Sequence, residues 1–324
     1  EYTKFLNKLY DSWCWRPPTY SQDTLHYFKD RVIEAGKTIE DRSFILLWEN
    51  EPVIVFIGIL IKSNDKIDLL AYEAPCITIE QEEKITTKAA KTFLKEFDRV
   101  SGALNGTIWY RDFTEGGNLS ILSRHLLLKG AESVPLFTHV IDLTVEESRL
   151  KSAIRKSYGS LINWGLRKLK PVVLGADQLT WEQMLEFRKL HIHESGRETR
   201  SEASWRLQFE MVQAKRAFII LGFLESELVS AGYFTYTRNN CHYGSSASRR
   251  DLFEKPLFHS LMWLAILRAK ELGCHWFEVG EQLYPNHPTS KPPYKKELGI
   301  SEFKAGFGGK TKMFLDLKLD KSSN

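Results

Sequence analysis

Hydrophobic and polar residues follow two rhythms along the chain, one typical of strands and the other of amphipathic helices. Three short apolar runs, at 44–48, 53–61 and 67–72, alternate with polar turns and predict a meander of three strands. The stretch 80–97 then spaces its apolar residues every three to four positions, which predicts a helix. The first half ends with a predicted strand, helix and strand at 107–110, 118–128 and 137–143.

The same order of elements recurs after residue 180. Thr180 and Gln183 form a capping box that starts a helix, and Gly196 is placed to end it. A second meander, a helix and a strand follow at 218–224, 228–237, 241–246, 257–272 and 276–278. The chain is therefore predicted to contain two diverged copies of one α+β domain, at 1–145 and 146–324.

The junction between the two copies, at 144–177, is basic. Its apolar residues recur every three to four positions over 150–166, which predicts a helix that Pro171 terminates. Five cations flank this apolar stripe: Arg155, Lys156, Arg167, Lys168 and Lys170. Such a charge run is typical of a solvated helix face and also suits the binding of phosphate groups.

Composition narrows the class of protein. Of 324 residues, 43% are hydrophobic and 27% are charged, which fits a globular chain with two cores and excludes a largely disordered one. The longest apolar run is too short to span a bilayer, and no leader-like segment opens the sequence. A net charge of +4 does not by itself demand a nucleic-acid partner. Four widely spaced cysteines favour a reducing compartment, so we expect a soluble, cytoplasmic protein.

Three segments carry the most specific signal: 155–168, 243–248, and 303–309, which reads Phe-Lys-Ala-Gly-Phe-Gly-Gly. In order and spacing they resemble the FemAB/FemX-type transferases. The resemblance implies an α+β fold of two tandem Gcn5-related N-acyltransferase-type domains with mixed, mostly antiparallel sheets. It also implies an acyltransferase that moves an aminoacyl group from aminoacyl-tRNA to an amine of a peptidoglycan or surface-glycan precursor, and hence a role in cell-wall or polysaccharide biosynthesis.

The resemblance implies that Lys304 lies at the acyl-transfer centre, where it steadies the carbonyl oxygen as negative charge develops. Glu278 and Glu281 follow the predicted strand at Trp276, and either carboxylate could take the proton of an attacking amine. Tyr243 could donate a proton or hold that amine. A solvated lysine in a glycine-rich turn and carboxylates paired with Arg or Lys are the structural alternatives.

Substrate binding is assigned to the basic junction, the hydroxyl-rich segment and the carboxyl-terminal motif. The predicted binding residues are Arg155, Lys156, Tyr158, Arg167, Lys168, Ser245, Ser246, Arg249 and Phe303. The junction cations suit a pyrophosphate-linked acceptor or the acceptor end of a tRNA. We expect 243–248 to open a helix, where the serine hydroxyls bind an anionic or carbonyl group or only cap the helix.

Two donor classes fit the sequence. Acyl-CoA enzymes of this fold usually carry a glycine-rich loop whose amides cradle the CoA pyrophosphate, whereas 249–256 has no glycine and two acids. Aminoacyl-tRNA is therefore the first candidate, and an acyl-CoA-dependent enzyme acting on an amino sugar is the alternative. We expect no tightly bound cofactor, and no metal because His191 and His193 lack a third spaced ligand. His242 and His259 are interpreted as packing or surface residues, and a non-catalytic glycan or nucleotide-sugar binding module is the alternative of a different class.

Overall fold

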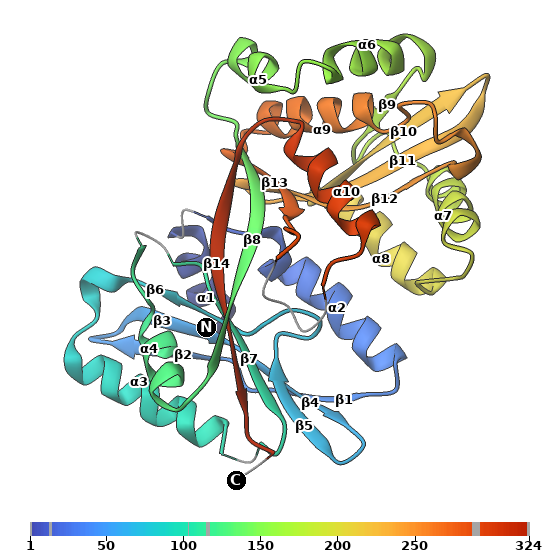
Figure 1. Cartoon of the computed structure of the whole chain (residues 1–324). Helices are drawn as coiled ribbons and strands as arrows, with labels where there is room; N and C mark the ends of the chain where they lie inside the picture. The colour runs from blue at the N-terminus through green and yellow to red at the C-terminus, as the bar shows by residue number, and fades with distance from the viewer. Residues whose placement is uncertain (1, 13–14, 103, 115–116, 287–291, 323–324) are drawn as a thin grey trace.

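The structure, a computed structural model, describes residues 2–12, 15–102, 104–114, 117–286 and 292–322. Two lobes lie one above the other in Figure 1, and two long strands, β8 (Glu132–Asp142) and β14 (Lys310–Asp320), run from one lobe into the other. Helices pack on a mainly antiparallel sheet that runs through both lobes, and the N-terminal lobe adds a second sheet of three strands. Across the described ranges, none of the helices has the length and apolar character that crossing a membrane requires.

The N-terminal half follows the predicted order of meander, helix, strand, helix and strand. Its helices are α1 (Tyr2–Ser12), α2 (Gln22–Glu34), α3 (Thr87–Val100) and α4 (Ile121–Leu128), with short 3-10 turns at Pro18–Tyr20 and Glu82–Lys84. Its strands before β8 are β1 (Thr38–Asp41), β2 (Phe44–Trp48), β3 (Glu51–Ile57), β4 (Ile59–Ser63), β5 (Lys66–Leu70), β6 (Ile77–Glu80) and β7 (Thr107–Asp112).

Local signals place most of these boundaries. Thr86 caps α3 by accepting a hydrogen bond from the Ala89 amide, and Phe93 and Phe97 bury one face of the helix. The predicted helix at 80–97 therefore starts later than expected, because Glu80 ends a strand, β6.

One predicted strand is in fact two strands in different sheets. The apolar run 53–61 divides at Gly58 into β3, which pairs with β2 and β6, and β4, which pairs with β1 and β5. A Cβ at Gly58 would lie 2.3 Å from the ring of Phe56 and 3.2 Å from Leu69. The division therefore needs a residue without a side chain, a requirement that the continuous hydrophobic pattern does not reveal.

The C-terminal half repeats the order of the first. Its helices are α7 (Trp181–Ser195), α8 (Glu202–Gln213), α9 (His259–Glu271) and α10 (Lys295–Ala305), with a 3-10 turn at Arg250–Leu252. Its strands are β9 (Val172–Leu174), β10 (Ala217–Leu224), β11 (Glu227–Tyr236), β12 (Asn240–Ser248), β13 (Trp276–Glu281) and β14. The capping box of Thr180 and Gln183 and the left-handed Gly196 after α7 are confirmed.

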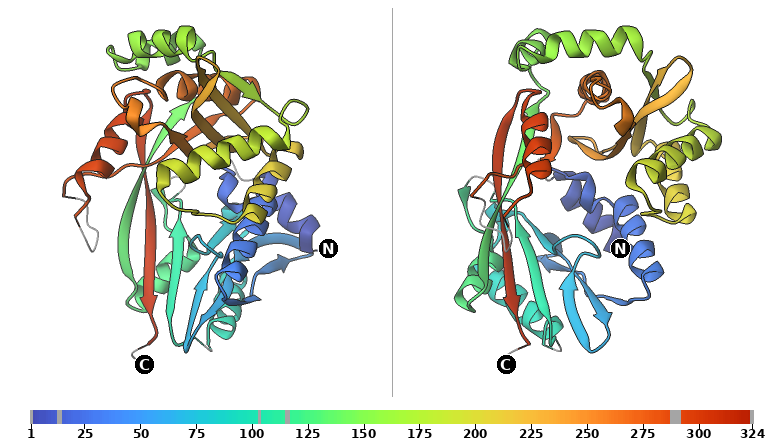
Figure 2. Two further views of the ribbon diagram at one scale, coloured as in Figure 1. Left: turned by 90° about the vertical axis from the view of Figure 1, so that its right-hand side faces the viewer. Right: turned by 45° about the vertical axis from the view of Figure 1, so that its right-hand side comes forward.

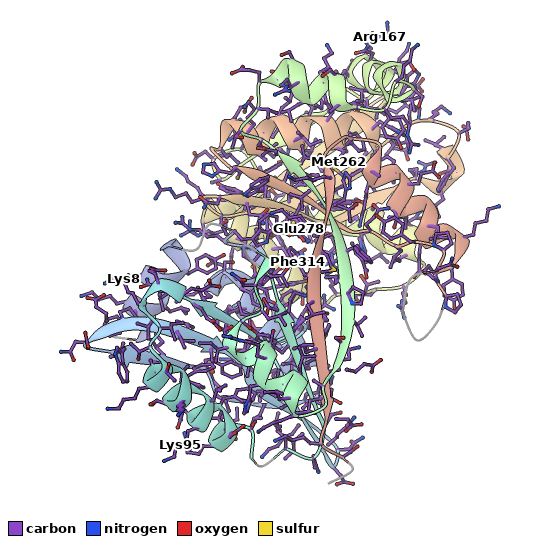
Figure 3. The ribbon with its side chains drawn as sticks, turned by 60° about the vertical axis from the view of Figure 1, so that its left-hand side comes forward. Lys8, Lys95, Arg167, Met262, Glu278 and Phe314 are labelled. Atoms are coloured by element: carbon purple, nitrogen blue, oxygen red, sulfur yellow. The ribbon has the colours of Figure 1, made fainter. Side chains whose placement is uncertain are left out.

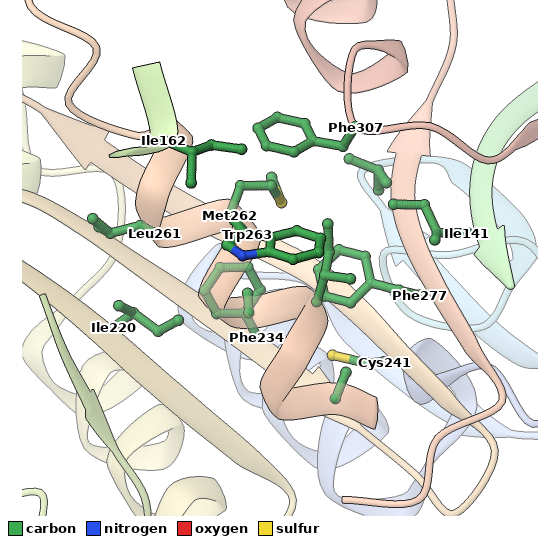
Figure 4. Packing of buried hydrophobic residues seen from close by; sticks show 14 of the residues in the cluster. Ile141, Ile162, Ile220, Phe234, Cys241, Leu261, Met262, Trp263, Phe277 and Phe307 are labelled. Carbon is green, nitrogen blue, oxygen red and sulfur yellow. The ribbon is translucent and has the colours of Figure 1, made fainter. Parts of the chain in front are cut away.

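The basic junction forms two helices, α5 (Glu147–Ala153) and α6 (Tyr158–Lys168), instead of one. α6 packs across α9: Ile162 belongs to the same core as Leu261 and Met262, and Phe307 lies beside Ile162 in that core (Figure 4). Leu150 and Ile162 of the predicted apolar stripe are therefore buried, whereas Leu166 at its end is exposed. The break between the helices comes from a tertiary contact of Arg155 that is described with the site.

The two halves share one sheet of eleven strands, in the order β1-β4-β5-β7-β14-β8-β13-β12-β11-β10-β9. β14, the last strand of the chain, pairs antiparallel with β7 and β8 of the N-terminal half, and β8 in turn pairs with β13. The boundary predicted between 145 and 146 falls after β8. A cut there would leave β14 on the C-terminal piece, apart from both of its partner strands.

The N-terminal helices also bridge the two halves. Figure 2 shows α1 and α2 between the lobes. Leu9 and Trp15 belong to a buried cluster with Val140 of β8 and Phe314 of β14. Glu34 of α2 accepts a hydrogen bond from Ser201, which caps α8, at 2.7 Å. The shared sheet and these helices hold the halves as one body.

Candidate active site

The catalytic candidates converge where two neighbouring strands of the C-terminal half stop pairing. β12 and β13 run parallel and pair only over 240–242 and 276–278. Beyond that point β12 continues beside β11 and β13 continues beside β8. We call this divergence of 243–248 from 279–281 the strand fork. The predicted hydroxyl-rich segment 243–248 thus lies in a strand and does not open a helix, since α9 begins only at His259.

Lys304 lies at the strand fork, on the last turn of α10 and not in a glycine-rich turn. Its Nζ donates a hydrogen bond to the backbone carbonyl of Glu281 at 3.3 Å. Gly280 leaves the room for this contact, because a Cβ there would lie 3.1 Å from Nζ. Burial lowers the pKa of Lys304, while the negative charges of Glu281 and Glu278 oppose that shift. A partly desolvated cation acts more strongly on a developing oxyanion than one in bulk water.

The two carboxylates of β13 have different surroundings. Glu278 accepts a hydrogen bond from Thr138 Oγ1 of β8 at 2.9 Å, and its Cα pairs with that of His242 across β12 and β13. Glu281 is exposed, and its backbone carbonyl accepts the hydrogen bond from Lys304. Of the two carboxylates, Glu278 is therefore the one that its neighbours hold in place, and it is the better candidate for a general base.

A groove of about 730 Å³ lies on one side of the strand fork, bordered by α9 and α10. We call it the α9–α10 groove. Tyr243 and Ser246 line it from β12, and Phe303 lines it from α10. Because Phe303 faces the groove and the next residue, Lys304, faces β13, the end of α10 lies between the groove and the fork. Further wall residues are Glu194, Arg250, Phe253, Lys255, Lys296 and Ile300.

The groove wall near the strand fork is aromatic and uncharged at neutral pH. The hydroxyls of Tyr243 and Ser246 are hydrogen-bonded, and burial raises the pKa of Tyr243 to about 12. The ring of His259 packs edge-on against Phe303, with centroids 5.1 Å apart, and burial lowers the pKa of His259 to about 4. At neutral pH neither ring therefore adds a cation to this part of the wall, and Lys304 faces β13 instead of the groove.

Carboxylates from three elements already bind the loop that follows β12. Arg249 forms ion pairs with Asp251 and Glu227. The buried carboxylate of Glu194 accepts a hydrogen bond from the Arg250 amide at 3.0 Å, and the Arg250 side chain lies 3.9 Å from the same oxygen. Arg249, predicted to bind substrate, is thus already paired within the chain, and a carboxylate already binds a backbone amide of this loop.

Two of the predicted junction residues fasten the end of α10. The Arg155 amide donates to Gly306 O at 2.8 Å, and its guanidinium donates to Glu302 O at 3.3 Å. Tyr158 Oη donates to Phe303 O at 3.3 Å. Arg155 therefore breaks the junction into two helices because its backbone bonds to the segment that carries Lys304. These two residues hold the Lys304 turn in place instead of lining the groove.

The other predicted binding cations of the junction are exposed to solvent. Lys156, Arg167 and Lys168 are exposed, and Arg167 donates only to Asn163 O, at 3.2 Å, among the contacts of the described residues. Figure 3 shows Arg167 at the outer end of the molecule and Glu278 near its middle. The predicted basic patch therefore divides into an inner, structural part and an outer, solvated part.

A second cavity, of about 190 Å³, lies on the other side of β12, between the two halves. We call it the interdomain cavity. β12 lines it with His242 and Ser245, α2 adds Arg31, and Arg200 donates to Ser245 Oγ at 3.4 Å. His242 and Tyr243 thus face opposite cavities, as successive residues of a strand do. The strand fork lies at the edge of β12, between the α9–α10 groove and the interdomain cavity.

The histidine pair of α7 does not form a metal site. His191 lines the α9–α10 groove, whereas His193 is mostly exposed and lies 2.8 Å from Glu194. Over the ranges that the structure covers, no three His, Cys, Asp or Glu side chains are grouped as metal ligands would be.

Sequence reasoning missed residues that other elements bring to the fork. Thr138 and His139 come from β8 of the N-terminal half, and His242 lines the interdomain cavity. The strand at 137–143 is predicted, but its partner is not, because Thr138 and Glu278 are 140 positions apart. A periodicity of two marks the faces of β8 without indicating which strand lies beside it.

The fold that positions this site is the tandem Gcn5-related N-acyltransferase fold. A tandem protein of this class from the clavulanic acid biosynthesis pathway matches with a TM-score of 0.50 and 11% identity, over 88% of this chain and 83% of that one. The α+β fold class predicted from the order of elements is confirmed.

Within this class, the chain has the fold of FemX. The crystal structure of FemX matches with a TM-score of 0.72 and 11% identity, over 97% of this chain and 95% of that one. The C-terminal domain of a proposed lysylphosphatidylglycerol synthetase from Agrobacterium fabrum matches with a TM-score of 0.55 and 12% identity, over 91% and 92%. Neither a family profile nor a curated protein sequence matches the chain. The resemblance to the FemAB/FemX type is thus confirmed for the fold.

Proposed function

We propose that the protein is an acyltransferase that moves an aminoacyl group from aminoacyl-tRNA onto an amine of a cell-wall or surface-glycan precursor. The observation that carries this proposal is the half-buried Lys304 ammonium at the strand fork, between two cavities of different character. The FemX fold supports it, as does the likeness to a domain whose name states an aminoacylated lipid as product.

In the proposed step, the acceptor nitrogen attacks the carbonyl carbon of the aminoacyl ester. The new C–N bond forms, the C–O bond to the ribose breaks, and the Lys304 ammonium stabilises the negative oxygen in between. Glu278 takes the proton from the nitrogen, and Tyr243, neutral at pH 7, gives its proton to the departing ribose oxygen. Both side chains then exchange protons with solvent. Most of the rate comes from alignment of the two substrates across the fork.

The α9–α10 groove is the proposed donor site. Its uncharged aromatic wall suits a planar base and an ester. The exposed Phe253 and the cations Lys255 and Lys296 also line the groove, where a base of single-stranded RNA can stack on the ring and its phosphates can pair with the cations. A CoA pyrophosphate fits less well. Glu194 already accepts from the Arg250 amide, so a diphosphate bound there would meet a buried carboxylate.

The interdomain cavity is the proposed acceptor site. Arg31 and Arg200 line it from opposite halves; Arg31 is in an ion pair with Glu73, at 3.2 Å, whereas Arg200 forms no ion pair among the described residues. Two guanidinium groups at one small cavity suit a phosphate-linked or carboxylate-bearing acceptor, because the planar fork of Arg binds such anions with two hydrogen bonds. His242 lines this cavity and its Cα pairs with that of Glu278, so the proposal puts the acceptor amine beside these two residues.

A donor screen with the full chain tests the proposal. The protein is incubated with a radiolabelled aminoacyl-tRNA pool and, separately, with labelled acetyl-CoA, each with a nucleotide-activated muropeptide as acceptor. We expect label to pass to the muropeptide from the tRNA pool, and RNase treatment of that pool before the assay to abolish the transfer. Transfer from acetyl-CoA alone would replace the proposal by the CoA-dependent alternative.

Arg200→Ala and Arg206→Ala give a matched comparison for the acceptor site, because Arg206 stacks on Trp181 and lines neither of the two cavities. We expect Arg200→Ala to raise the KM for the muropeptide about tenfold or more, the loss of one charged hydrogen bond. Arg206→Ala should leave that KM within twofold. Binding of the muropeptide without transfer from any donor would favour a non-catalytic module.

A further inference from the structure

The N-terminal half contributes a histidine to the turn that carries Lys304. His139 of β8 is 5% exposed, and its Nε2 lies 2.6 Å from the carbonyl oxygen of Gly308. A carbonyl oxygen only accepts hydrogen bonds, so Nε2 must carry the proton. Nδ1 is then the unprotonated nitrogen, and it is buried without a hydrogen-bond partner among the described residues.

The position of His139 in the sheet places it beside the strand fork. Its Cα pairs with that of Gly280 on β13 and with that of Thr311 on β14. Gly280 is the residue whose missing side chain leaves room for the Lys304 ammonium. The His139 side chain therefore bonds to the turn just after α10. The Lys304 side chain, at the end of α10, in turn bonds to β13, the strand that pairs with β8 at His139.

The turn that accepts this hydrogen bond has little freedom. Gly308 and Gly309 have φ values of +81° and +92°. A Cβ at Gly308 would lie 2.9 Å from Ala153, and one at Gly309 would lie 2.4 Å from the carbonyl oxygen of Val140. The turn is therefore pressed between α5 and β8, and the His139 bond fixes its direction as it leaves the last turn of α10.

The environment keeps this imidazole neutral. Burial lowers the pKa of His139, and the nearby charge of Lys304 lowers it further, against the opposing effect of the Gly308 bond. A second proton would place a buried N–H without an acceptor beside a cation. Neutral His139 can therefore hold the turn without weakening the positive charge of Lys304.

We propose that His139 is a positioning residue for the transfer centre: its Nε2–H bond to Gly308 O sets the end of α10, so that the Lys304 ammonium lies at the strand fork. The effect of His139 on catalysis rests on the proposed function, whereas its effect on the position of Lys304 does not. It also means that the fork of the C-terminal half is complete only when β8 of the N-terminal half lies beside it.

Three substitutions separate the two nitrogens of the ring. In His139→Gln, the side-chain amide nitrogen takes the place of Nε2 and can still donate to Gly308 O. In His139→Asn, the shorter side chain reaches only the place of Nδ1, and His139→Leu removes both groups. We expect kcat to stay within about threefold in the Gln variant and to fall about 10²-fold in the Asn and Leu variants, with KM for the donor nearly unchanged, because a displacement near 1 Å costs that much.

A readout independent of transfer accompanies the kinetics. ¹⁵N NMR of histidine-labelled full chain should show the neutral Nε2–H tautomer for His139. ¹³C NMR of reductively methylated protein should show a lowered pKa for Lys304 in the wild type and in His139→Gln, and a return toward the ordinary lysine value in His139→Leu and His139→Asn.

An unchanged Lys304 titration in folded His139→Leu and His139→Asn protein overturns the inference, and so does a Gln variant as impaired as the Leu variant. Full activity in the Asn variant together with loss in the Gln variant would assign the role to Nδ1 and also overturn it. If the wild type transfers from no donor, the proposed function fails, while the Lys304 titration still decides whether His139 positions that residue.

Discussion

Replacing Gly280 by Ala should separate the position of Lys304 from the stability of the chain. Gly280 has a φ of +103°, where any residue with a side chain is strained by about 1–2 kcal/mol. Its new Cβ would also lie 3.1 Å from Lys304 Nζ and 3.9 Å from Cε. The end of a lysine side chain is flexible, so the ammonium moves away from the strand fork before the backbone does.

The size of the effect follows from these two terms. Strain alone lowers the free energy of unfolding by about 1–2 kcal/mol, which a chain of this size tolerates. A shift of the ammonium by a fraction of an ångström up to about 1 Å lowers kcat by up to about 10²-fold, since the charge no longer faces the developing oxyanion. The KM for the donor should change little, because the groove wall is not touched.

Gly273→Ala is the matched control. Gly273 also has a positive φ, +82°, but a Cβ there would meet nothing within 4 Å. Urea unfolding and single-turnover transfer of both variants form the assay. We expect both to lose about 1–2 kcal/mol of stability and only Gly280→Ala to lose activity. Full activity in Gly280→Ala, or an equal loss in Gly273→Ala, would refute the reasoning.

Three further outcomes are expected. Activity should fall as pH rises through the lowered pKa of Lys304, and Lys304→Arg should move that limb of the pH–rate profile upward, because Arg stays charged. Burial raises the pKa of Glu80 from 4.5 to about 7, so the free energy of unfolding of the wild type falls as pH rises between these values. In urea unfolding, Glu80→Gln should therefore be more stable than the wild type at pH 8, by up to about 3 kcal/mol, and equally stable at pH 4. Leu317→Ala in β14 should lower the free energy of unfolding by about 2–5 kcal/mol and the midpoint of a single calorimetric transition, since both halves share that strand. Two separate transitions would contradict this.

The sequence predicts those parts of the fold whose causes are local. Thr180, Gln183 and Gly196 bound α7 as predicted, because the hydrogen bonds that cap a helix involve residues within one turn of its ends. The second meander, β10 to β12, and the apolar helix α9 also lie where their local patterns predict them, whereas the first meander divides at Gly58 between two sheets. Two copies of one α+β domain follow from the order of these elements.

The parts that were not predicted depend on contacts between distant segments. The junction is two helices because the Arg155 amide bonds to Gly306 O, and the apolar spacing of 150–166 carries no sign of that partner. β14 lies between β7 and β8, an arrangement that only the full sheet reveals. Strand periodicity gives its faces but not its neighbours.

The candidate site divides in the same way. Lys304, Phe303, Glu278 and Tyr243 lie around the strand fork, as the motif at 303–309 and the strand ends suggested. Tyr158, a predicted binding residue, is buried and donates a hydrogen bond to the backbone of α10. The basic residues of the junction do not reveal which of its neighbouring side chains are turned inward, as Tyr158 is, and which outward, as Arg167 is.

The central claim is that the ammonium of Lys304 acts on the transferred carbonyl, and single-turnover transfer with Lys304→Ala tests it most directly. Lys296→Ala is the matched control. It removes the same type of side chain from the same helix, about two turns before Lys304, where Lys296 lines the α9–α10 groove. The claim predicts a loss of 10²–10³-fold in the transfer rate for Lys304→Ala, about that of removing an oxyanion donor, with wild-type rate at saturating donor for Lys296→Ala. An unaltered rate in folded Lys304→Ala protein would contradict it.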